Sequence, residues 1–260
     1  MHLIDSHCHL DRINLKKIKM NLDELLQNAI LNKVNFFLTV STSIKNFKKI
    51  SNSIKKKNVF HSCGIHPLYV KKVETDSLNL EKFSKKKKVI AIGETGLDYF
   101  YNKTNIEFQK KSFRNHIQIA KKTKKPIIVH SRSSIQDTIK ILKEEKANDC
   151  RGILHSFSEK KIKYAKQLLD LGFYISFSGI ITFNKTDEIK KVLNYIPFES
   201  ILLETDSPYL SPFPNRGKEN QPAYLPYIAK RVAKIKKIKF ENLINITTKN
   251  FYELFPKINS

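Results

Sequence analysis

Histidines and carboxylates of this chain recur directly after short apolar runs. The first run ends in His7-Cys8-His9, and residues two apart in an extended segment point the same way. Both imidazoles can therefore meet one cation, and imidazole nitrogen suits Zn²⁺ and other first-row metals. Two incidental histidines in a loop would show the same spacing, so this motif alone leaves both interpretations open.

Carboxylates occupy comparable positions later in the chain. Glu94 directly follows the apolar run 89–92, where a carboxylate is costly to bury without a cationic partner. A helix N-cap or an ordinary ion pair is the alternative role for this glutamate. Glu204 and Asp206 follow the apolar run 201–203 and are two residues apart, so they share one face of an extended segment.

Three further histidines end apolar runs, namely His66, His130 and His155. A lone histidine at a strand end is more often a hydrogen-bonding residue than a metal ligand. His66 stands just before Pro67, which enforces an extended or turn geometry. We interpret His66 as a contact to a substrate phosphate, or as a proton donor, with a loop-stabilising hydrogen bond as the alternative.

Taken together, six of these residues suit hydrolysis at a metal centre. The ligand candidates are His7, His9, Glu94, His130, His155 and Asp206. They suffice for two divalent cations, which a bridging Glu94 carboxylate would hold about 3.5–4 Å apart. Such a pair lowers the pKa of a bound water toward roughly 7 and neutralises the negative charge on phosphoryl oxygens. Both effects suit the hydrolysis of a phosphodiester. Glu94 and Asp206 are the candidate catalytic residues, and Asp206 could also accept a proton from the water. Glu204 is a separate candidate, which could orient a histidine ligand.

The elements that must position these residues alternate regularly along the chain. Short apolar runs rich in β-branched and aromatic residues predict eight strands, at 2–6, 34–41, 58–64, 88–93, 126–130, 152–156, 173–177 and 200–205. Segments of helical period separate them, at 22–32, 44–56, 76–86, 105–123, 134–145, 158–170, 187–195 and 222–236, and 240–255 predicts one or two further helices. Asp76 and Ser158 are the predicted N-caps.

This alternation predicts an α/β fold with a parallel sheet. Eight repeats in 260 residues favour a closed (β/α)8 TIM barrel over an open sheet, which would more often carry a glycine-rich phosphate loop after its first strand. In a barrel the carboxyl ends of all strands meet at one rim, so the six ligand candidates are expected to converge there. No linker-like segment interrupts residues 1–260, which we predict to be a single domain.

The composition permits a polyanionic partner without establishing one. The formal net charge is +24, and a basic chain attracts nucleic acid. Most of the basic residues are lysines, and because Lys, Asn and Ile all have A/T-rich codons, genome base bias would give the same composition. Lysine runs such as Lys85 to Lys88 are interpreted as solvated helix ends.

Signals of compartment and membrane are sparse. The cysteines Cys8, Cys63 and Cys150 form no C-x-x-C pair, which fits a reducing cytoplasm. The sequence opens on a predicted strand rather than on a signal peptide, and no apolar run approaches the roughly 18 residues that a membrane helix needs. We therefore expect a cytoplasmic monomer without membrane contact.

Motifs spread over nearly the whole chain resemble those of the TatD-type deoxyribonucleases. They occur in family order and are DSHCHLD at 5–11, GIHP at 64–67, AIGETGLDY at 91–99, PIIVHSR at 126–132, HSFS at 155–158, ISFSG at 175–179, LETDSPYL at 203–210 and PNRGKENQP at 214–222. The chain departs from the common family pattern at Ser133, Ser134, Ser156 and Glu159, none of which is a candidate ligand.

The resemblance implies a TIM-barrel metal-dependent hydrolase of the amidohydrolase-like group. By motif position the six candidates above match the metal ligands, and His66 matches a residue near the substrate phosphate. Arg132 and Arg216 fall in motifs near the site and are expected to bind substrate, with a structural ion pair as the alternative for Arg132. The family is associated with Mg²⁺, Mn²⁺ or Zn²⁺ and with 3′–5′ exonuclease action on DNA. We therefore expect two divalent ions per subunit and single-stranded DNA or 3′ ends as substrate.

Two other function classes stay open on sequence alone. One is hydrolysis of a small-molecule ester or amide on the same barrel, which needs an enclosed pocket rather than a groove flanked by basic and aromatic residues. Tyr99, Phe100 and Tyr101 follow the fourth strand and could stack on bases or simply pack on the barrel. The other is non-catalytic nucleic-acid binding, which the charge suggests and the set of six ligands disfavours.

Overall fold

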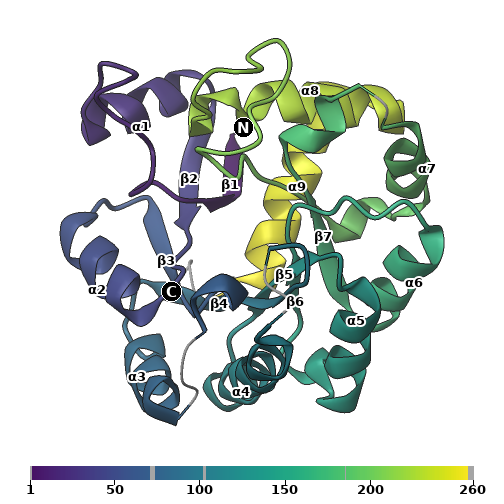
Figure 1. Cartoon of the computed structure of the whole chain (residues 1–260). Coiled ribbons are helices and arrows are strands. Elements are labelled where there is room, and N and C mark those ends of the chain that lie inside the picture. The colour runs from purple at the N-terminus through teal and green to yellow at the C-terminus, as the bar shows by residue number, and fades with distance from the viewer. Residues whose placement is uncertain (1, 71–73, 102–103, 185, 257–260) are drawn as a thin grey trace. The chain divides into compact units, whose positions relative to one another are not determined.

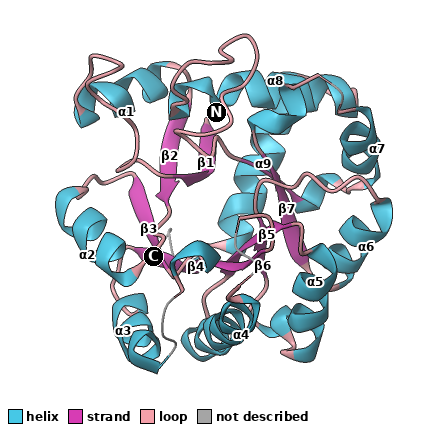
Figure 2. Cartoon of the chain, in the orientation of Figure 1, coloured by secondary structure: helices cyan, strands magenta, loops and turns pink. Residues whose placement is uncertain are grey.

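The computed structural model describes residues 2–70, 74–101, 104–184 and 186–256, in which strands and helices alternate (Figures 1 and 2). The strands are β1 (Leu3–Cys8), β2 (Val34–Thr39), β3 (Val59–Cys63), β4 (Val89–Asp98), β5 (Ile127–Arg132), β6 (Gly152–Leu154), β7 (Phe173–Phe177) and β8 (Ile201–Leu203). The helices are α1 (Leu22–Leu31), α2 (Ile44–Ser53), α3 (Glu74–Ser84), α4 (Ile106–Thr123), α5 (Ile135–Glu144), α6 (Ile162–Asp170), α7 (Asp187–Tyr195), α8 (Leu225–Lys236) and α9 (Phe240–Leu254). Each predicted strand and helix is present, with ends that differ by a few residues.

The chain divides into two compact units. The first unit comprises residues 1–39, 156–165 and 175–253, and the second comprises residues 40–155, 166–174 and 254–260. The first unit contains the parallel pairs β1–β2 and β7–β8. The second contains the parallel strands β3, β4, β5 and β6, in that order. The prediction of a single domain over the whole chain stays a prediction.

In the first unit the end of β8 is tied to β1. The Asp206 amide donates to the His7 carbonyl at 2.9 Å, and the Ser6 hydroxyl donates to the Leu203 carbonyl at 2.9 Å. Buried backbone groups of this kind need partners, and here the partners come from the opposite end of the sequence. These bonds hold the segments that carry His7 and Asp206 side by side.

In the second unit helices cover one face of the four strands. Helix α4 packs against β4, and its Phe113 and Ile117 are fully buried. Figure 1 shows α2, α3 and α4 on the outer side of β3 and β4. The helical spacing of the apolar residues thus directs one face of each helix to the strands and leaves the lysine-rich face to solvent.

Strand β4 is longer than the sequence predicts. The apolar run predicts an end near Gly93, but β4 continues through Asp98, so Glu94 lies within the strand. Gly96 has a φ of +130°, and a Cβ there would lie 2.0 Å from the carbonyl oxygen of His130 on β5. Glycine therefore permits the close approach of β4 and β5 that places Glu94 and Asp98 beside His130.

Neither of the two predicted N-caps is correct. Helix α3 begins at Glu74, so Asp76 lies inside it, and helix α6 begins only at Ile162, well after Ser158. A cap-type residue is a weak start signal by itself, because Ser and Asp are equally common in turns.

Among the residues that the structure describes, no helix combines the length and the apolar character needed to cross a membrane.

Candidate metal centres

Three predicted ligands meet in the second unit, one from β4, one from β5 and one from the residue that follows β6. Glu94 Oε1 lies 3.1 Å from His130 Nδ1 and 3.0 Å from His155 Nε2, and the two nitrogens are 3.2 Å apart. We call these three residues the Glu94 cluster. Glu94 and His155 are buried, so the cluster is largely withdrawn from bulk water.

The spacing within the Glu94 cluster fits a single cation. Two ligand atoms that each lie about 2.0–2.1 Å from one cation are roughly 2.8–3.4 Å apart at octahedral to tetrahedral angles. All three separations in the cluster, 3.0, 3.1 and 3.2 Å, fall in that range. The donor set of two imidazole nitrogens and one carboxylate oxygen is one that zinc and other first-row metals use.

Asp98 holds His130 in the orientation that ligation needs. Asp98 Oδ2 lies 3.1 Å from His130 Nε2, while Oδ1 accepts hydrogen bonds from the amides of Phe100 at 3.0 Å and Tyr101 at 2.9 Å. In the neutral ring, the Asp98 carboxylate keeps the proton on Nε2 and leaves the Nδ1 lone pair facing the cluster. The sequence prediction missed Asp98. The available signal was its even spacing from Glu94, which puts both on one face of an extended strand.

The Glu94 cluster favours positive charge. Burial raises the pKa of Glu94, but the charges and hydrogen bonds of His66, His155 and His130 outweigh it, so this pKa lies well below its usual range. Burial lowers the pKa of His130, yet hydrogen bonds and charge from Asp98 and Glu94 leave it above its usual value. Two ionised carboxylates in a desolvated site attract a cation, and a divalent metal ion would supply that charge.

His66 lies beside the Glu94 cluster and uses its two nitrogens differently. Nδ1 accepts a hydrogen bond from the Leu68 amide at 3.2 Å, and Nε2 lies 3.5 Å from Glu94 Oε1. In the neutral ring the proton is then on Nε2, which makes that atom a donor. Distance alone would allow His66 to share a metal with Glu94 and His130. The protonated Nε2 instead favours contact with an anionic oxygen, while Nδ1 holds the loop.

The remaining three predicted ligands lie in the first unit and also meet. His7 Nε2 and His9 Nε2 are 3.3 Å apart, and each lies 3.6 Å from Asp206 Oδ1. We call these three residues the His7 cluster. The separations are at or slightly above the range expected around one cation, so small side-chain shifts suffice to bring all three atoms to one ion.

Two buried carboxylates support the His7 cluster. Asp5 shares a face of β1 with His7 and accepts hydrogen bonds from the Thr205 amide at 2.9 Å and hydroxyl at 2.6 Å. Burial raises the pKa of Asp5 to about 7, and the nearby Glu204 charge adds to this, against the opposing hydrogen bonds from Thr205. A Glu204 carboxylate oxygen lies within 4.8 Å of a His7 ring nitrogen, close to the ring it is predicted to orient. The sequence prediction missed Asp5, although residues 5 and 7 share one face of β1.

The two predicted substrate arginines lie against aromatic rings. In the second unit, the guanidinium of Arg132 lies 4.3 Å from the ring centre of Phe100 and 4.5 Å from that of Tyr101. In the first unit, the guanidinium of Arg216 lies 3.7 Å from the ring centre of Phe183. Stacking of this kind fixes the plane of a guanidinium, and Arg216 Nη1 also donates a hydrogen bond to the Ser211 carbonyl at 2.8 Å.

The structure thus gathers the six ligand candidates into two sets of three, one in each unit. Each set offers imidazole nitrogens and a carboxylate oxygen at ligand spacing. The convergence of both sets on one rim and the bridging role of Glu94 stay predictions.

Comparison with known proteins gives the class of protein first. The crystal structure of YJJV, a TatD homologue from Escherichia coli K12, matches this chain with a TM-score of 0.90 and 25% sequence identity, covering 98% of each chain. An uncharacterized metal-dependent hydrolase of Buchnera aphidicola is 52% identical, over 98% of this chain and 99% of its own length. These similarities confirm the predicted (β/α)8 TIM-barrel fold and the class of metal-dependent hydrolases.

The family follows from two further matches. The family model described as TatD related DNase matches residues 4–256. YcfH of Escherichia coli, also an uncharacterized metal-dependent hydrolase, is 43% identical over 98% of this chain and 96% of its own length. The chain belongs to the TatD family.

Proposed function

We propose that this hydrolase cleaves phosphodiester bonds of DNA, as a 3′–5′ exodeoxyribonuclease with two divalent ions, Mg²⁺, Mn²⁺ or Zn²⁺. One ion is held by the Glu94 cluster and the other by the His7 cluster. The observation that carries the proposal is the triangle of Glu94 Oε1, His130 Nδ1 and His155 Nε2, whose edges of 3.0–3.2 Å suit a single cation. The description of the family as DNases supports the choice of DNA.

In this proposal each residue at the site has a role that follows from its chemistry. When bound, divalent ions neutralise charge on phosphoryl oxygens and make a coordinated water more acidic. His66 donates its Nε2 proton in a hydrogen bond to a phosphate oxygen, as its accepting Nδ1 requires. Asp206 accepts a proton from the attacking water, and Asp98 keeps His130 Nδ1 unprotonated.

The proposed substrate is a single strand or a 3′ end. Phe100 and Tyr101 are 58% and 62% exposed, and the Arg132 guanidinium lies over both rings. Exposed aromatic rings next to a guanidinium can stack on bases and contact a phosphate. Arg216 is proposed to contact substrate from the first unit.

The three free, buried cysteines fit the proposed location in a reducing cytoplasm.

The test is a nuclease assay on single-stranded DNA with added Mg²⁺ or Mn²⁺. The wild type is compared with a Glu94→Ala, His130→Ala double variant and with Lys140→Gln on the surface of α5 as a control. We expect 3′-end degradation by the wild type and by the control, and none by the double variant. Activity that survives the double variant rejects the mechanism. Absence of nuclease activity, together with metal-dependent cleavage of small esters or amides, assigns the same centres to the alternative substrate class.

A further inference from the structure

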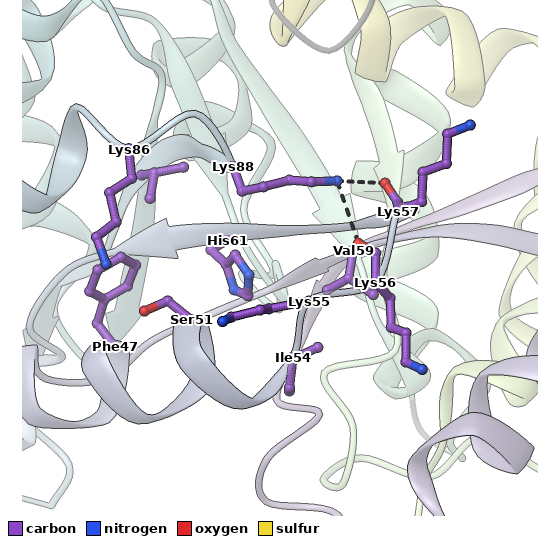
Figure 3. Close-up of a pocket in the computed structure, with 11 residues that line it drawn as sticks. Phe47, Ser51, Ile54, Lys55, Lys56, Lys57, Val59, His61, Lys86 and Lys88 are labelled. Atoms are coloured by element: carbon purple, nitrogen blue, oxygen red, sulfur yellow. Dashed lines mark hydrogen bonds between the residues drawn. The ribbon is translucent and has the colours of Figure 1, made fainter.

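A lysine-rimmed pocket lies at the amino-terminal ends of β3 and β4, away from the Glu94 cluster (Figure 3). Its walls include Val59 and Val89, the first residues of these strands, whereas Glu94 and Asp98 lie further along β4. The pocket has a volume of about 310 Å³. That is the lower end of the roughly 300–1,000 Å³ typical of small-molecule sites. We call it the lysine pocket.

The rim of the lysine pocket is strongly cationic. It carries Lys55, Lys56, Lys57, Lys86 and Lys88, and none of the lining residues is acidic. Lys88 is not the solvated helix end that the sequence predicts, because its ammonium donates to the Lys57 carbonyl at 2.5 Å and lies 4.4 Å from the Phe60 ring centre. Burial, together with the charges of Lys87 and Lys57, lowers the pKa of Lys88. The positive charges of these neighbouring lysines repel one another, and a bound anion would reduce that repulsion.

The floor of the lysine pocket is apolar and holds one buried histidine. Phe47, Ile54, Val59 and Val89 line the floor. His61 is 3% exposed, and its Nδ1 is a buried atom with no hydrogen-bond partner. Figure 3 shows the His61 ring facing the space between Lys88 and Lys55. Unmatched buried polar atoms are uncommon in folded proteins, and such an atom in a pocket is available to bind a ligand.

The chemistry of His61 specifies what that ligand must offer. The ring hydrogen-bonds to the Ile54 backbone, and because Nδ1 has no partner we assign this bond to Nε2. Burial, with the charges of Lys88 and Lys86, lowers the pKa of His61 to about 4. The ring is therefore neutral at physiological pH, with its proton directed at the Ile54 carbonyl. Nδ1 is then an acceptor, so the missing partner is a hydroxyl or amino group of the ligand.

We propose that the lysine pocket binds a mononucleotide. The phosphate meets the ammonium groups of Lys55 and Lys86 and the hydroxyl of Ser51, which Figure 3 shows beside Lys55. A sugar hydroxyl or base amino group donates to His61 Nδ1, and the flat base covers the apolar floor. A nucleic-acid strand fits less well, because the volume accommodates about one nucleotide and the buried acceptor lies inside the pocket rather than along a groove.

The experiment is calorimetric titration of the full chain with 2′-deoxyadenosine 5′-monophosphate at low salt. A Lys55→Gln, Lys86→Gln double variant is expected to weaken binding at least tenfold. Lys140→Gln with Lys143→Gln, a matched loss of two exposed charges on α5, is expected to leave the affinity unchanged. The Glu94→Ala, His130→Ala variant is also expected to bind normally, so this result does not depend on the proposed nuclease activity.

Two ligand controls test the chemistry. Deoxyadenosine, which lacks the phosphate, and inorganic phosphate, which lacks the donor and the base, are each expected to bind at least tenfold more weakly than the mononucleotide. Equal affinity for inorganic phosphate overturns the role of His61 and the apolar floor. Binding that disappears in the Glu94→Ala, His130→Ala variant and persists in the Lys55→Gln, Lys86→Gln variant overturns the site itself. A longer oligonucleotide that binds more tightly through the same lysines assigns the pocket to a strand instead.

Discussion

Replacement of Asp98 by asparagine should disable the Glu94 cluster without removing any ligand. The Asp98 Oδ1 atom accepts from the amides of Phe100 and Tyr101 at 3.0 and 2.9 Å, and Oδ2 lies 3.1 Å from His130 Nε2. In the Asp98→Asn variant the amide oxygen keeps the two backbone hydrogen bonds, so the NH₂ group faces His130. Nε2 must then accept a hydrogen bond, and the imidazole proton moves to Nδ1, the atom that we propose as the metal ligand.

The expected loss is large for so small a change. Substitution of a residue that orients a metal ligand typically lowers metal affinity or activity by about 10–100-fold. We expect roughly 100-fold for Asp98→Asn, equivalent to about 2.7 kcal/mol, because the tautomer changes as well as the orientation. The assay is Mn²⁺ titration calorimetry together with metal-dependent hydrolysis, with the thermal midpoint measured in parallel.

The matched control for Asp98→Asn is Asp137→Asn. Asp137 accepts from the Tyr99 hydroxyl at 2.8 Å and pairs with Lys110 at 3.1 Å, so it loses the same charge in the same unit without contacting His130. We expect metal affinity to fall in Asp98→Asn alone, at a nearly unchanged thermal midpoint. Equal metal affinities in the two variants would refute the reasoning about the His130 tautomer.

Three further predictions concern residues outside the two clusters. Burial lowers the pKa of His116 to about 4, so below pH 6.5 the unfolded chain takes up a proton that the folded chain does not. The free energy of unfolding in urea should therefore fall by about 2–3 kcal/mol between pH 6.5 and 4.5 because of this group. The His116→Gln variant should lack this contribution. Gly96→Ala places a Cβ 2.0 Å from the His130 carbonyl oxygen at a φ of +130°. It should cost at least about 3 kcal/mol, and a stability equal to wild type would contradict the packing of β4 on β5. Phe113→Ala removes a fully buried ring from α4 and should cost about 3–5 kcal/mol by the same measurement, whereas a loss below about 1 kcal/mol would contradict its burial.

The alternation of strands and helices could be predicted from sequence because it depends on local periodicity. Apolar runs and helical stripes recur at fixed spacing, and each predicted element is found. The end of β4 could not be predicted in this way. Gly93, Gly96 and the charge of Glu94 all suggest a loop, and only the contact with His130 on β5 shows why the strand continues through them.

The ligand candidates could be found from residue type and spacing, whereas their supporting contacts could not. Asp98 reaches His130 on the next strand, and Asp5 reaches Thr205 from the far end of the chain. Such pairings depend on which strands lie side by side, and no local pattern records that. The lysine pocket was missed for the same reason, because its walls come from segments that are distant in sequence.

The most direct test of the central claim is X-ray diffraction from crystals of the full chain soaked with Mn²⁺, recorded at a wavelength where manganese scatters anomalously. We predict one anomalous peak at about 2.0–2.3 Å from Glu94 Oε1, His130 Nδ1 and His155 Nε2, and a second among His7 Nε2, His9 Nε2 and Asp206 Oδ1. Both peaks should be absent from a Glu94→Ala, His130→Ala, His7→Ala variant. Crystals of the wild type that bind Mn²⁺ at neither cluster would contradict the account.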